Sequence, residues 1–376
     1  MSNKKKVEDL LAEAESHKIQ ELKADNVKLL RQLEKAKNKK ADMVDAVYQA
    51  VSTNLRTWDK PKIPKPKLPR RNKNEEVAVA VLSDVQLAKV TPDYNTKVAE
   101  ERVVEYADKI VELTNVQRSA HPVNKCVVLA AGDIVEGELI FPGQTHLIDA
   151  SLYNQVTIDG PRILTKFFDT LLANFNEVEV HWVIGNHGSL GGRARKDYHP
   201  DSNADRMLGK IMDMVYEKDN RIQFIIPDSE GDNHWFDIAN LGEGCKFFVW
   251  HGDNIRGHSG FPWYGFGKKL LGWKALASRG LMPDFDYAIA GHWHTPTTMY
   301  VNDIRLWVNG STESYNTYAL EQLASMGRPC QWLLFAKPNH GVTAEYLVKL
   351  THNWYNIEYY DKKLSAIWVE IDWYWV

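Results

Sequence analysis

Two apolar runs near the middle of the chain are each followed directly by polar residues that could bind a metal. Lys125–Ala131 (KCVVLAA) runs into Gly132-Asp133-Ile134-Val135-Glu136, and Val178–Ile184 (VEVHWVI) runs into Gly185-Asn186-His187-Gly188. Short apolar runs bounded by turn residues are typical of buried strands. Residues 149–175 between them have a helical pattern. This stretch therefore predicts a strand, a helix and a second strand, the alternation found in α/β folds.

The same pattern, a buried strand that ends in polar residues, occurs three more times in the chain. These occurrences are Val77–Leu82 before Ser83-Asp84-Val85-Gln86, Cys245–Trp250 before His251-Gly252-Asp253, and Asp286–Ala290 before Gly291-His292-Trp293-His294. The carboxyl ends of the strands form the edge of an open α/β sheet at which ligands bind. Carboxylate and amide oxygens together with imidazoles suit divalent transition metals. The five motifs therefore predict a site for two divalent cations.

The remaining elements indicate an α/β fold with two sheets. Helices are expected at 97–117 and 203–217, and further strands at 221–226, 235–239, 299–301, 305–308, 331–335 and 342–348. Strand–helix alternation in the first half and a strand-rich second half are typical of a two-sheet β-sandwich flanked by helices. We expect one such domain over residues 77–352.

Residues 1–57 have the pattern of a long helix. With Ile19 at position a, eight of the ten heptad core positions are apolar, and neither glycine nor proline interrupts residues 7–57. Asn26 falls at an a position, where asparagine favours a parallel dimer in one register. We expect a coiled coil that joins two copies of the chain. The alternative is a single amphipathic helix that packs on its own domain.

The segments on either side of the domain differ from it in composition. Residues 58–76 are rich in proline and lysine, which predicts an extended linker, and residues 353–376 form an aromatic extension. Residues 1–75 carry 19 Lys and Arg against 11 Asp and Glu, whereas the rest of the chain carries 27 against 38. The basic part could follow a nucleic-acid backbone, or it could be a solvated spacer.

The composition excludes several classes of protein. Apolar residues make up 44% and charged residues 25% of the chain, which excludes wholesale disorder. No apolar run approaches the roughly 18 residues of a membrane span. The three cysteines, Cys126, Cys245 and Cys330, are widely spaced and form neither a disulfide framework nor a metal motif. We expect a cytoplasmic protein without a membrane partner, located in the host cytoplasm if the chain is viral.

The five motifs, in this order and spacing, resemble those of the calcineurin-like metallophosphoesterase superfamily. The family pattern is Asp-x-His, Gly-Asp-x-x-Asp/Glu, Gly-Asn-His-Asp/Glu, a lone His, and Gly-His-x-His. The resemblance extends from Val77 to about Leu350. Within the superfamily, the chain most resembles phage-type members and double-strand-break-repair nucleases. It implies the calcineurin-like phosphoesterase fold and two divalent cations, with manganese expected first and iron or zinc as the alternatives.

The resemblance also implies a role for each matching residue. The first cation would be bound by Asp84, Gln86, Asp133 and His294, and the second by Asp133, Asn186, His251 and His292. His187 would be the catalytic histidine, outside the coordination sphere, that contacts the phosphate or protonates the leaving group.

Two residues depart from the family pattern. Gln86 replaces a histidine, and an amide oxygen is the weaker donor for soft transition metals. Gly188 replaces the usual Asp or Glu, which removes a carboxylate that would tune His187. A degenerate, non-catalytic member is therefore an alternative interpretation. Six motif residues are retained, and they argue against this interpretation, because buried polar groups without a metal would be costly. They are Asp133, Asn186, His187, His251, His292 and His294.

The leading hypothesis is a phosphodiesterase that acts on nucleic acid with metal-activated water. Arg193 and Arg195, in the glycine-rich loop after the third motif, and His258, after the fourth, could contact substrate phosphates. A phosphomonoesterase or protein phosphatase is the second hypothesis, although Gly188 lacks the carboxylate that those members usually carry. The third is a non-catalytic scaffold that acts through its coiled coil.

Overall fold

The computed structural model describes Gln49 and residues 62–68, 75–192, 199–228, 233–257, 260–316 and 327–350. The helices and strands given below all belong to one compact unit within residues 57–376. The predicted coiled coil, apart from Gln49, and the predicted aromatic extension lie outside the described residues. The coiled coil, the homodimer and the domain boundaries therefore stay predictions.

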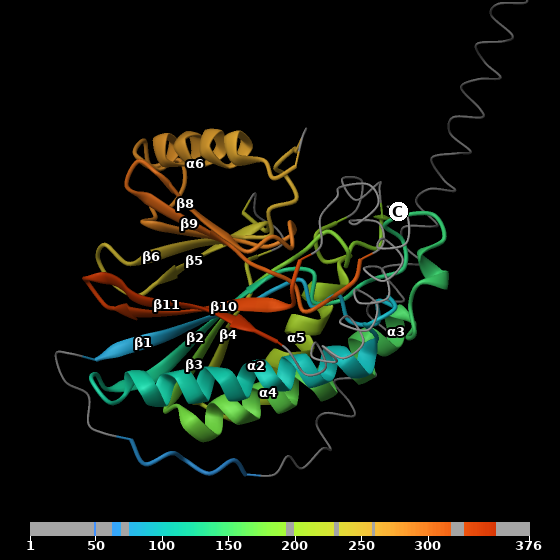
Figure 1. Cartoon of the computed structure of the whole chain (residues 1–376), viewed down its shortest axis with the longest axis horizontal. Helices are drawn as coiled ribbons and strands as arrows, with labels where there is room; N and C mark the ends of the chain where they lie inside the picture. Colours follow the sequence, from blue (N-terminus) through green and yellow to red (C-terminus); the bar gives the residue numbers. More distant parts are fainter. Residues whose placement is uncertain are drawn as a thin grey trace, which may run out of the picture. The chain divides into compact units, whose positions relative to one another are not determined.

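The first sheet has six strands in the order β11-β10-β1-β2-β3-β4 (Figure 1). Their bounds are β1 Glu76–Leu82, β2 Val123–Ala131, β3 Glu177–Val183, β4 Ile222–Ile225, β10 Cys330–Lys337 and β11 Gly341–Lys349. Strands β1 to β4 are parallel, and β10 pairs with β1 in the antiparallel direction. The parallel strands place their carboxyl ends at one edge.

The second sheet has five strands in the order β5-β6-β7-β9-β8. Their bounds are β5 Phe236–Asn240, β6 Lys246–Trp250, β7 Tyr287–Ala290, β8 Thr297–Val301 and β9 Ile304–Val308. The three central strands β6, β7 and β9 are parallel, and the edge strands β5 and β8 are antiparallel to their neighbours.

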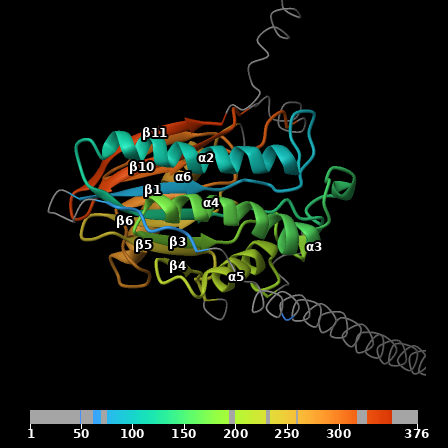
Figure 2. The same cartoon turned by 90° about the horizontal axis from the view of Figure 1, so that it is seen from below.

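Helices cover the outer faces of both sheets. Figures 1 and 2 show α2 (Thr96–Gln117), α4 (Gly160–Asn174) and α5 (Ala204–Tyr216) over the first sheet, and Figure 1 shows α6 (Trp263–Ala277) over the second. The short elements η1 (Gln144–His146), α3 (Leu152–Asn154) and the π-helical turn η2 (Gln155–Asp159) precede α4. Asn95 and Asn203 cap α2 and α5, because each side chain accepts a hydrogen bond from the first turn of its helix.

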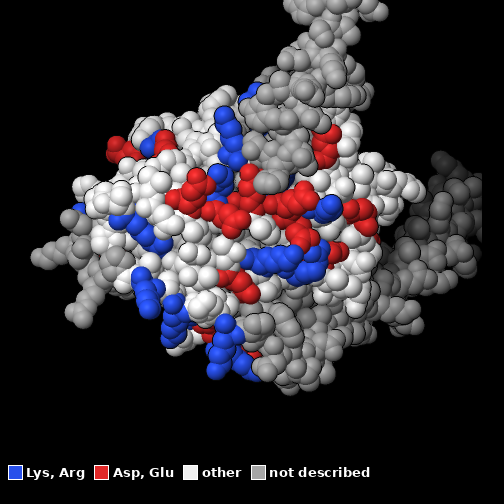
Figure 3. Space-filling view, turned by 60° about the horizontal axis from the view of Figure 1, so that its bottom comes forward, with Lys and Arg blue, Asp and Glu red and all other residues white. Residues whose placement is uncertain are grey.

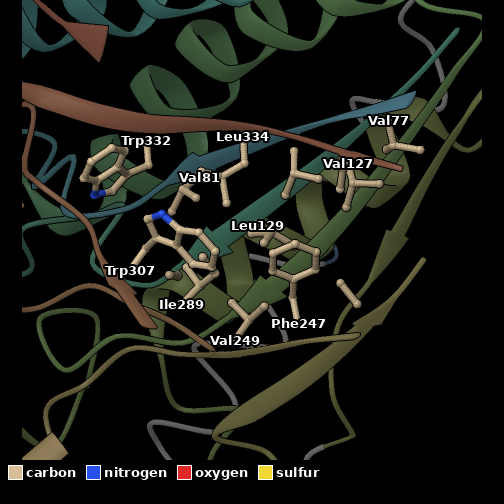
Figure 4. Close-up of a cluster of buried hydrophobic side chains, with 14 of the residues drawn as sticks. Val77, Val81, Val127, Leu129, Phe247, Val249, Ile289, Trp307, Trp332 and Leu334 are labelled. Atoms are coloured by element: carbon tan, nitrogen blue, oxygen red, sulfur yellow. The ribbon is translucent and has the colours of Figure 1, made fainter. Parts of the chain in front are cut away.

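The core between the sheets is built from alternate residues of the central strands. On β1, the side chains of Val77, Val79 and Val81 belong to this core, and the residues between them are buried on the helical side. Figure 4 shows Phe247 and Trp307 from the second sheet packed against the first. Burial on both faces explains why these strands are continuous apolar runs, and each buried side chain contributes roughly 1.5–3 kcal/mol.

The prediction of a two-sheet α/β sandwich flanked by helices is confirmed. All three cysteines are free and buried. Within the described residues, no helix has both the length and the apolar character needed to cross a membrane.

Candidate metal centre

The carboxyl ends of five strands meet at one end of the sandwich. Strands β1, β2 and β3 of the first sheet and β6 and β7 of the second lead into the five motifs. A cavity of about 850 Å³ opens over them. Its wall includes the motif residues Gln86, Asn186, His187, His292 and His294 together with apolar and aromatic side chains. A ligand in this cavity therefore meets side chains from both sheets.

Asp133, Asn186 and His251 converge below the cavity. The Nε2 atom of His251 lies 2.9 Å from Oδ2 of Asp133 and 3.0 Å from Oδ1 of Asn186. His292 joins this group, since one ligand atom each of Asp133, His251 and His292 lie within 4.8 Å of one another. These four residues follow four different strands, so only the tertiary fold brings them together.

The orientation of His251 allows its Nε2 to act as a ligand. Nδ1 of His251 lies 2.8 Å from the carbonyl oxygen of Ala131, to which it donates, so the ring presents a lone pair at Nε2 when it is neutral. In that state the lone pair faces the oxygens of Asp133 and Asn186. Apart from its contact with His251, the buried Oδ2 of Asp133 has no hydrogen-bond partner among the described residues. Imidazole, carboxylate and amide groups converging in this way fit a divalent cation.

The charges of the site shift the pKa values of its members. Burial opposes ionisation of Asp133, but His251 and His187 outweigh it and hold the pKa of Asp133 below its usual range. Burial lowers the pKa of His251, but Asp133 raises it to a net value of about 10. Burial and the charge of His251 lower the pKa of His292 to about 4. A cation that binds here therefore competes with a proton on His251.

Five of the motif residues have left-handed backbone conformations. They are Asp84 (φ 52°), Gln86 (φ 46°), Asp133 (φ 53°), His292 (φ 71°) and His294 (φ 49°). Residues other than glycine adopt this region at a cost of roughly 1–3 kcal/mol, and such strain gathers at functional sites. Hydrogen bonds between the first two motifs hold the turns in place, because Asp84 N donates to Gly132 O and Gln86 N donates to Asp133 O.

Asp84 and His294 lie beside this group and belong to the other predicted cation position. Nε2 of His294 is 3.3 Å from Oδ1 of Asp84, and the same oxygen accepts a 2.9 Å hydrogen bond from the backbone of His292. On its far side, Nδ1 of His294 lies 2.7 Å from Oε1 of the buried Glu313. A carboxylate behind an imidazole is the usual support of a metal-binding histidine.

Gln86 has a different environment from the other motif residues. Its Oε1 accepts a 2.5 Å hydrogen bond from Nζ of Lys89, and its Nε2 lies 3.3 Å from Nε2 of His294. Lys89 also forms a 2.5 Å ion pair with Glu313. The ligand role of Gln86 stays a prediction, and its amide oxygen is engaged by a lysine in this structure.

His187 faces the cavity with a carboxylate behind it. Its Nδ1 lies 3.0 Å from Oε2 of the buried Glu136, and its Nε2 lies 3.9 Å from Oδ2 of Asp133. Burial lowers the pKa of His187, but Asp133 and Glu136 raise it above the ordinary value. The carboxylate missing at position 188 is thus supplied by Glu136. At Gly188 itself, a Cβ atom would lie 2.7 Å from Oδ1 of Asn203, so that position has no room for a side chain.

Asp205 holds the turns of the second and third motifs together. Its carboxylate accepts hydrogen bonds of 2.8–3.1 Å from four backbone N–H groups, those of Asp133, Ile134, Val135 and Gly185. It lies at the start of α5, two residues after the Asn203 cap. Burial and the charge of Asp133 raise the pKa of Asp205 to about 6. Asp205 therefore positions Asp133 and Asn186 without facing the cavity.

The structure brings together most of the site residues predicted from the motifs. Asp84, Gln86, Asp133, Asn186, His187, His251, His292 and His294 lie around one end of the sandwich. Arg193, Arg195 and His258 lie outside the described residues, so their substrate contacts stay predictions. Sequence reasoning missed Lys89, Asp205 and Glu313, and it missed that Glu136 supports His187. Glu136 could have been identified, because it is the last residue of the second motif. No motif in the sequence includes Lys89, Asp205 or Glu313.

Comparisons with known proteins give one family and several distant structures. The model of the calcineurin-like phosphoesterase family matches residues 77–296. A search of curated proteins found no match. An archaeal phosphodiesterase is 14% identical, with 72% of this chain and 99% of that chain covered and a TM-score of 0.32. A predicted phosphoesterase from Streptococcus pneumoniae is 15% identical, with 72% of this chain and 98% of that chain covered and a TM-score of 0.29. Vacuolar protein sorting 29 from Cryptosporidium parvum is 12% identical, with 73% of this chain and 98% of that chain covered and a TM-score of 0.34.

Proposed function

We propose that this chain, which belongs to the calcineurin-like phosphoesterase family, hydrolyses phosphodiester bonds with water activated by divalent cations. The observation that carries the proposal is the cluster of Asp133, Asn186 and His251, whose oxygen and nitrogen ligand atoms converge below the cavity. The family match supports the hydrolysis of phosphoesters. The preference for diesters rests on the shape and lining of the cavity.

The residues divide into two ligand sets in this proposal. Asn186, His251 and His292 would hold one cation and Asp84, Gln86 and His294 the other, with Asp133 shared between them and manganese as the preferred metal. Bound cations lower the pKa of water and neutralise phosphoryl oxygens. Behind the ligands, Ala131 O fixes the ring of His251, and Glu313 fixes that of His294.

His187 provides the proton for the leaving group in this proposal. Nδ1 donates a hydrogen bond to the backbone oxygen of Glu136 and lies 3.0 Å from its carboxylate, which leaves Nε2 as the atom that faces the cavity. Because Asp133 and Glu136 raise the pKa of His187, the ring retains its proton to higher pH than an isolated histidine. Proton transfer from Nε2 to the departing oxygen is worth roughly 10²–10⁴-fold in rate.

The cavity is larger than a phosphate group requires. It measures about 850 Å³, and Phe141, Trp293 and Tyr315 are among the side chains in its wall. Aromatic rings stack on nucleobases without sequence preference. The cavity therefore has room and apolar contacts for an organic group on each side of a phosphate. This supports a phosphodiester substrate, and the aromatic side chains favour a nucleic acid among the diesters.

The helical face of the domain does not add a basic surface for such a substrate. Figure 3 shows Asp and Glu gathered in a band across this face, with Lys and Arg in separate groups beside it. Arg162 and Lys166 of α4 pair with Glu100 of α2. We therefore propose that nucleic acid approaches through the cavity, assisted by the basic residues within positions 1–75.

Two assays test this proposal. Turnover of bis-p-nitrophenyl phosphate and of the monoester is compared for the metal-free full-length chain after addition of Mn²⁺, with Asp133→Asn as the inactive control. We expect the diester to be hydrolysed faster. Faster hydrolysis of the monoester would favour a phosphomonoesterase or protein phosphatase, and no turnover of either would favour a non-catalytic scaffold. Single- and double-stranded oligonucleotides then test the nucleic-acid substrate separately.

A further inference from the structure

Lys89 is a largely buried cation at the edge of the candidate metal centre. Its ammonium lies 2.5 Å from Oε1 of Gln86 and 2.5 Å from Oε2 of Glu313, and the exposed fractions of the Lys89 and Glu313 side chains are 14% and 3%. The sequence gives no motif at this position. An ammonium group can only donate hydrogen bonds, so the oxygen of the Gln86 amide must face Lys89.

This orientation turns the amide oxygen of Gln86 away from the first cation position. The other end of the amide, Nε2, lies 3.3 Å from Nε2 of His294, the atom that would bind a cation there. An amide nitrogen is a hydrogen-bond donor and not a metal ligand. Asp84, Asp133 and His294 therefore fit a cation at this position, whereas Gln86 does not while Lys89 holds its oxygen.

Lys89 also changes the balance of charge at the site. The ammonium of Lys89 and the ring of His294 share the carboxylate of Glu313, so this positive charge lies beside the first position. A divalent cation bound there would face a like charge in a largely buried site. Such a contact is costly, because little water screens it.

The second cation position has no such neighbour. In the described part of the chain, the hydrogen bonds and ion pairs found for the side chains of Asn186, His251 and His292 involve neither lysine nor arginine. The two positions therefore differ in both ligands and charge, although Asp133 is placed to serve both of them.

We infer that Lys89 competes with a divalent cation for the first position, so that the chain binds one cation tightly and a second one weakly. The inference rests on the proposed function, because it takes the centre to be a metal site. The tight position is that of Asp133, Asn186, His251 and His292. The first position binds its cation only when the ammonium of Lys89 releases the amide oxygen of Gln86 and the carboxylate of Glu313.

Metal titration tests this inference without measuring turnover. The full-length chain is freed of metal with a chelator and titrated with Mn²⁺, and free Mn²⁺ is counted by electron paramagnetic resonance. For the wild type we expect one tight equivalent and a second that binds at least about tenfold more weakly. Lys89→Met should tighten the second equivalent at least about tenfold, because it removes the competing charge. Lys89→Arg, which keeps the charge, should leave it weak.

Lys109→Met is the matched control, since Lys109 is a surface residue of α2 that pairs with Glu112. It should give the wild-type titration. Two equally tight equivalents in the wild type, or a Lys89→Met titration that equals that of the wild type, would overturn the inference while leaving the proposed function intact. A wild type that binds no Mn²⁺ would overturn both. If Lys89→Met does not fold, Lys89→Gln replaces it, and the wild-type titration remains decisive by itself.

Discussion

Replacing Glu136 with glutamine should slow turnover without emptying the metal centre. Oε2 of Glu136 lies 3.0 Å from Nδ1 of His187, and the carboxylate is buried. Glutamine has nearly the same shape, but its amide has only one oxygen, whereas Oε1 of Glu136 accepts a hydrogen bond from Nε2 of Gln144 and Oε2 faces His187. The change therefore removes a negative charge and one acceptor, and both losses weaken the support that Glu136 gives to the protonated ring.

The size of the effect follows from the distance between the two groups. Unit charges 3.0 Å apart attract each other by about 5.5 kcal/mol at an effective dielectric constant near 20. Desolvation of the buried pair offsets a large part of this attraction. We expect roughly a hundredfold decrease in kcat, which is about 2.7 kcal/mol and the lower end of what general acid catalysis contributes. Metal content should stay unchanged, since Glu136 is not in either ligand set.

The pH profile provides a second readout of the same change. Glu136 helps to raise the pKa of His187, so its neutralisation lowers that pKa. If the protonated ring is the acid, the high-pH limb of kcat moves to lower pH in Glu136→Gln. Steady-state kinetics on bis-p-nitrophenyl phosphate measure both effects, with Glu112→Gln on the surface of α2 as the control. Unchanged kcat and an unshifted limb would refute the assignment of Glu136 as the support of His187.

Three further changes test other parts of the structure. Asp133→Asn should abolish turnover and lower metal affinity while the fold persists by circular dichroism; retained activity with full metal content would contradict the shared-ligand role. Gly188→Ala should destabilise the domain by about 1–3 kcal/mol, because its Cβ would lie 2.7 Å from Oδ1 of Asn203, and an unchanged unfolding midpoint would count against this. His181 links the sheets through a 2.7 Å contact with Asp237 that raises its pKa against the effect of burial. While Asp237 is ionised, the wild type should be more stable than His181→Gln by about 2 kcal/mol at pH values below about 6.5, the pKa of histidine in the unfolded chain. This difference in the free energy of unfolding should shrink as the pH rises through the raised pKa of His181. A difference that does not change with pH would contradict the ion pair.

The fold and the motif residues could be predicted because they depend on local patterns. Strands such as β1 and β2 are buried on both faces, so they appear as continuous apolar runs, and each run ends at the residue where the chain turns into the site. Asp84, Asp133 and Asn186 follow such ends directly. The position of these residues in space then follows from the rule that strands in a parallel sheet share one carboxyl edge.

The support around the motifs could not be predicted, because it depends on contacts between distant parts of the chain. Lys89 lies just after the first motif and Glu313 after β9, and nothing in either local sequence indicates that they form an ion pair. Asp205 appears in the sequence as an ordinary residue of a helix start, yet it binds the backbone of two motifs. Gly188 suggested a missing carboxylate, whereas the structure shows that Asn203 occupies the space and that Glu136 supplies the charge.

Anomalous scattering from a crystal of the full-length chain soaked in Mn²⁺ shows whether the cluster around Asp133 binds a metal. We expect a peak at the manganese edge within bonding distance of Asp133 Oδ2, Asn186 Oδ1, His251 Nε2 and a ring nitrogen of His292. We also expect a weaker peak, or none at low Mn²⁺, beside Asp84 and His294. Diffraction that shows these side chains well ordered at saturating Mn²⁺, with no anomalous peak among Asp133, Asn186 and His251, would refute their assignment as metal ligands.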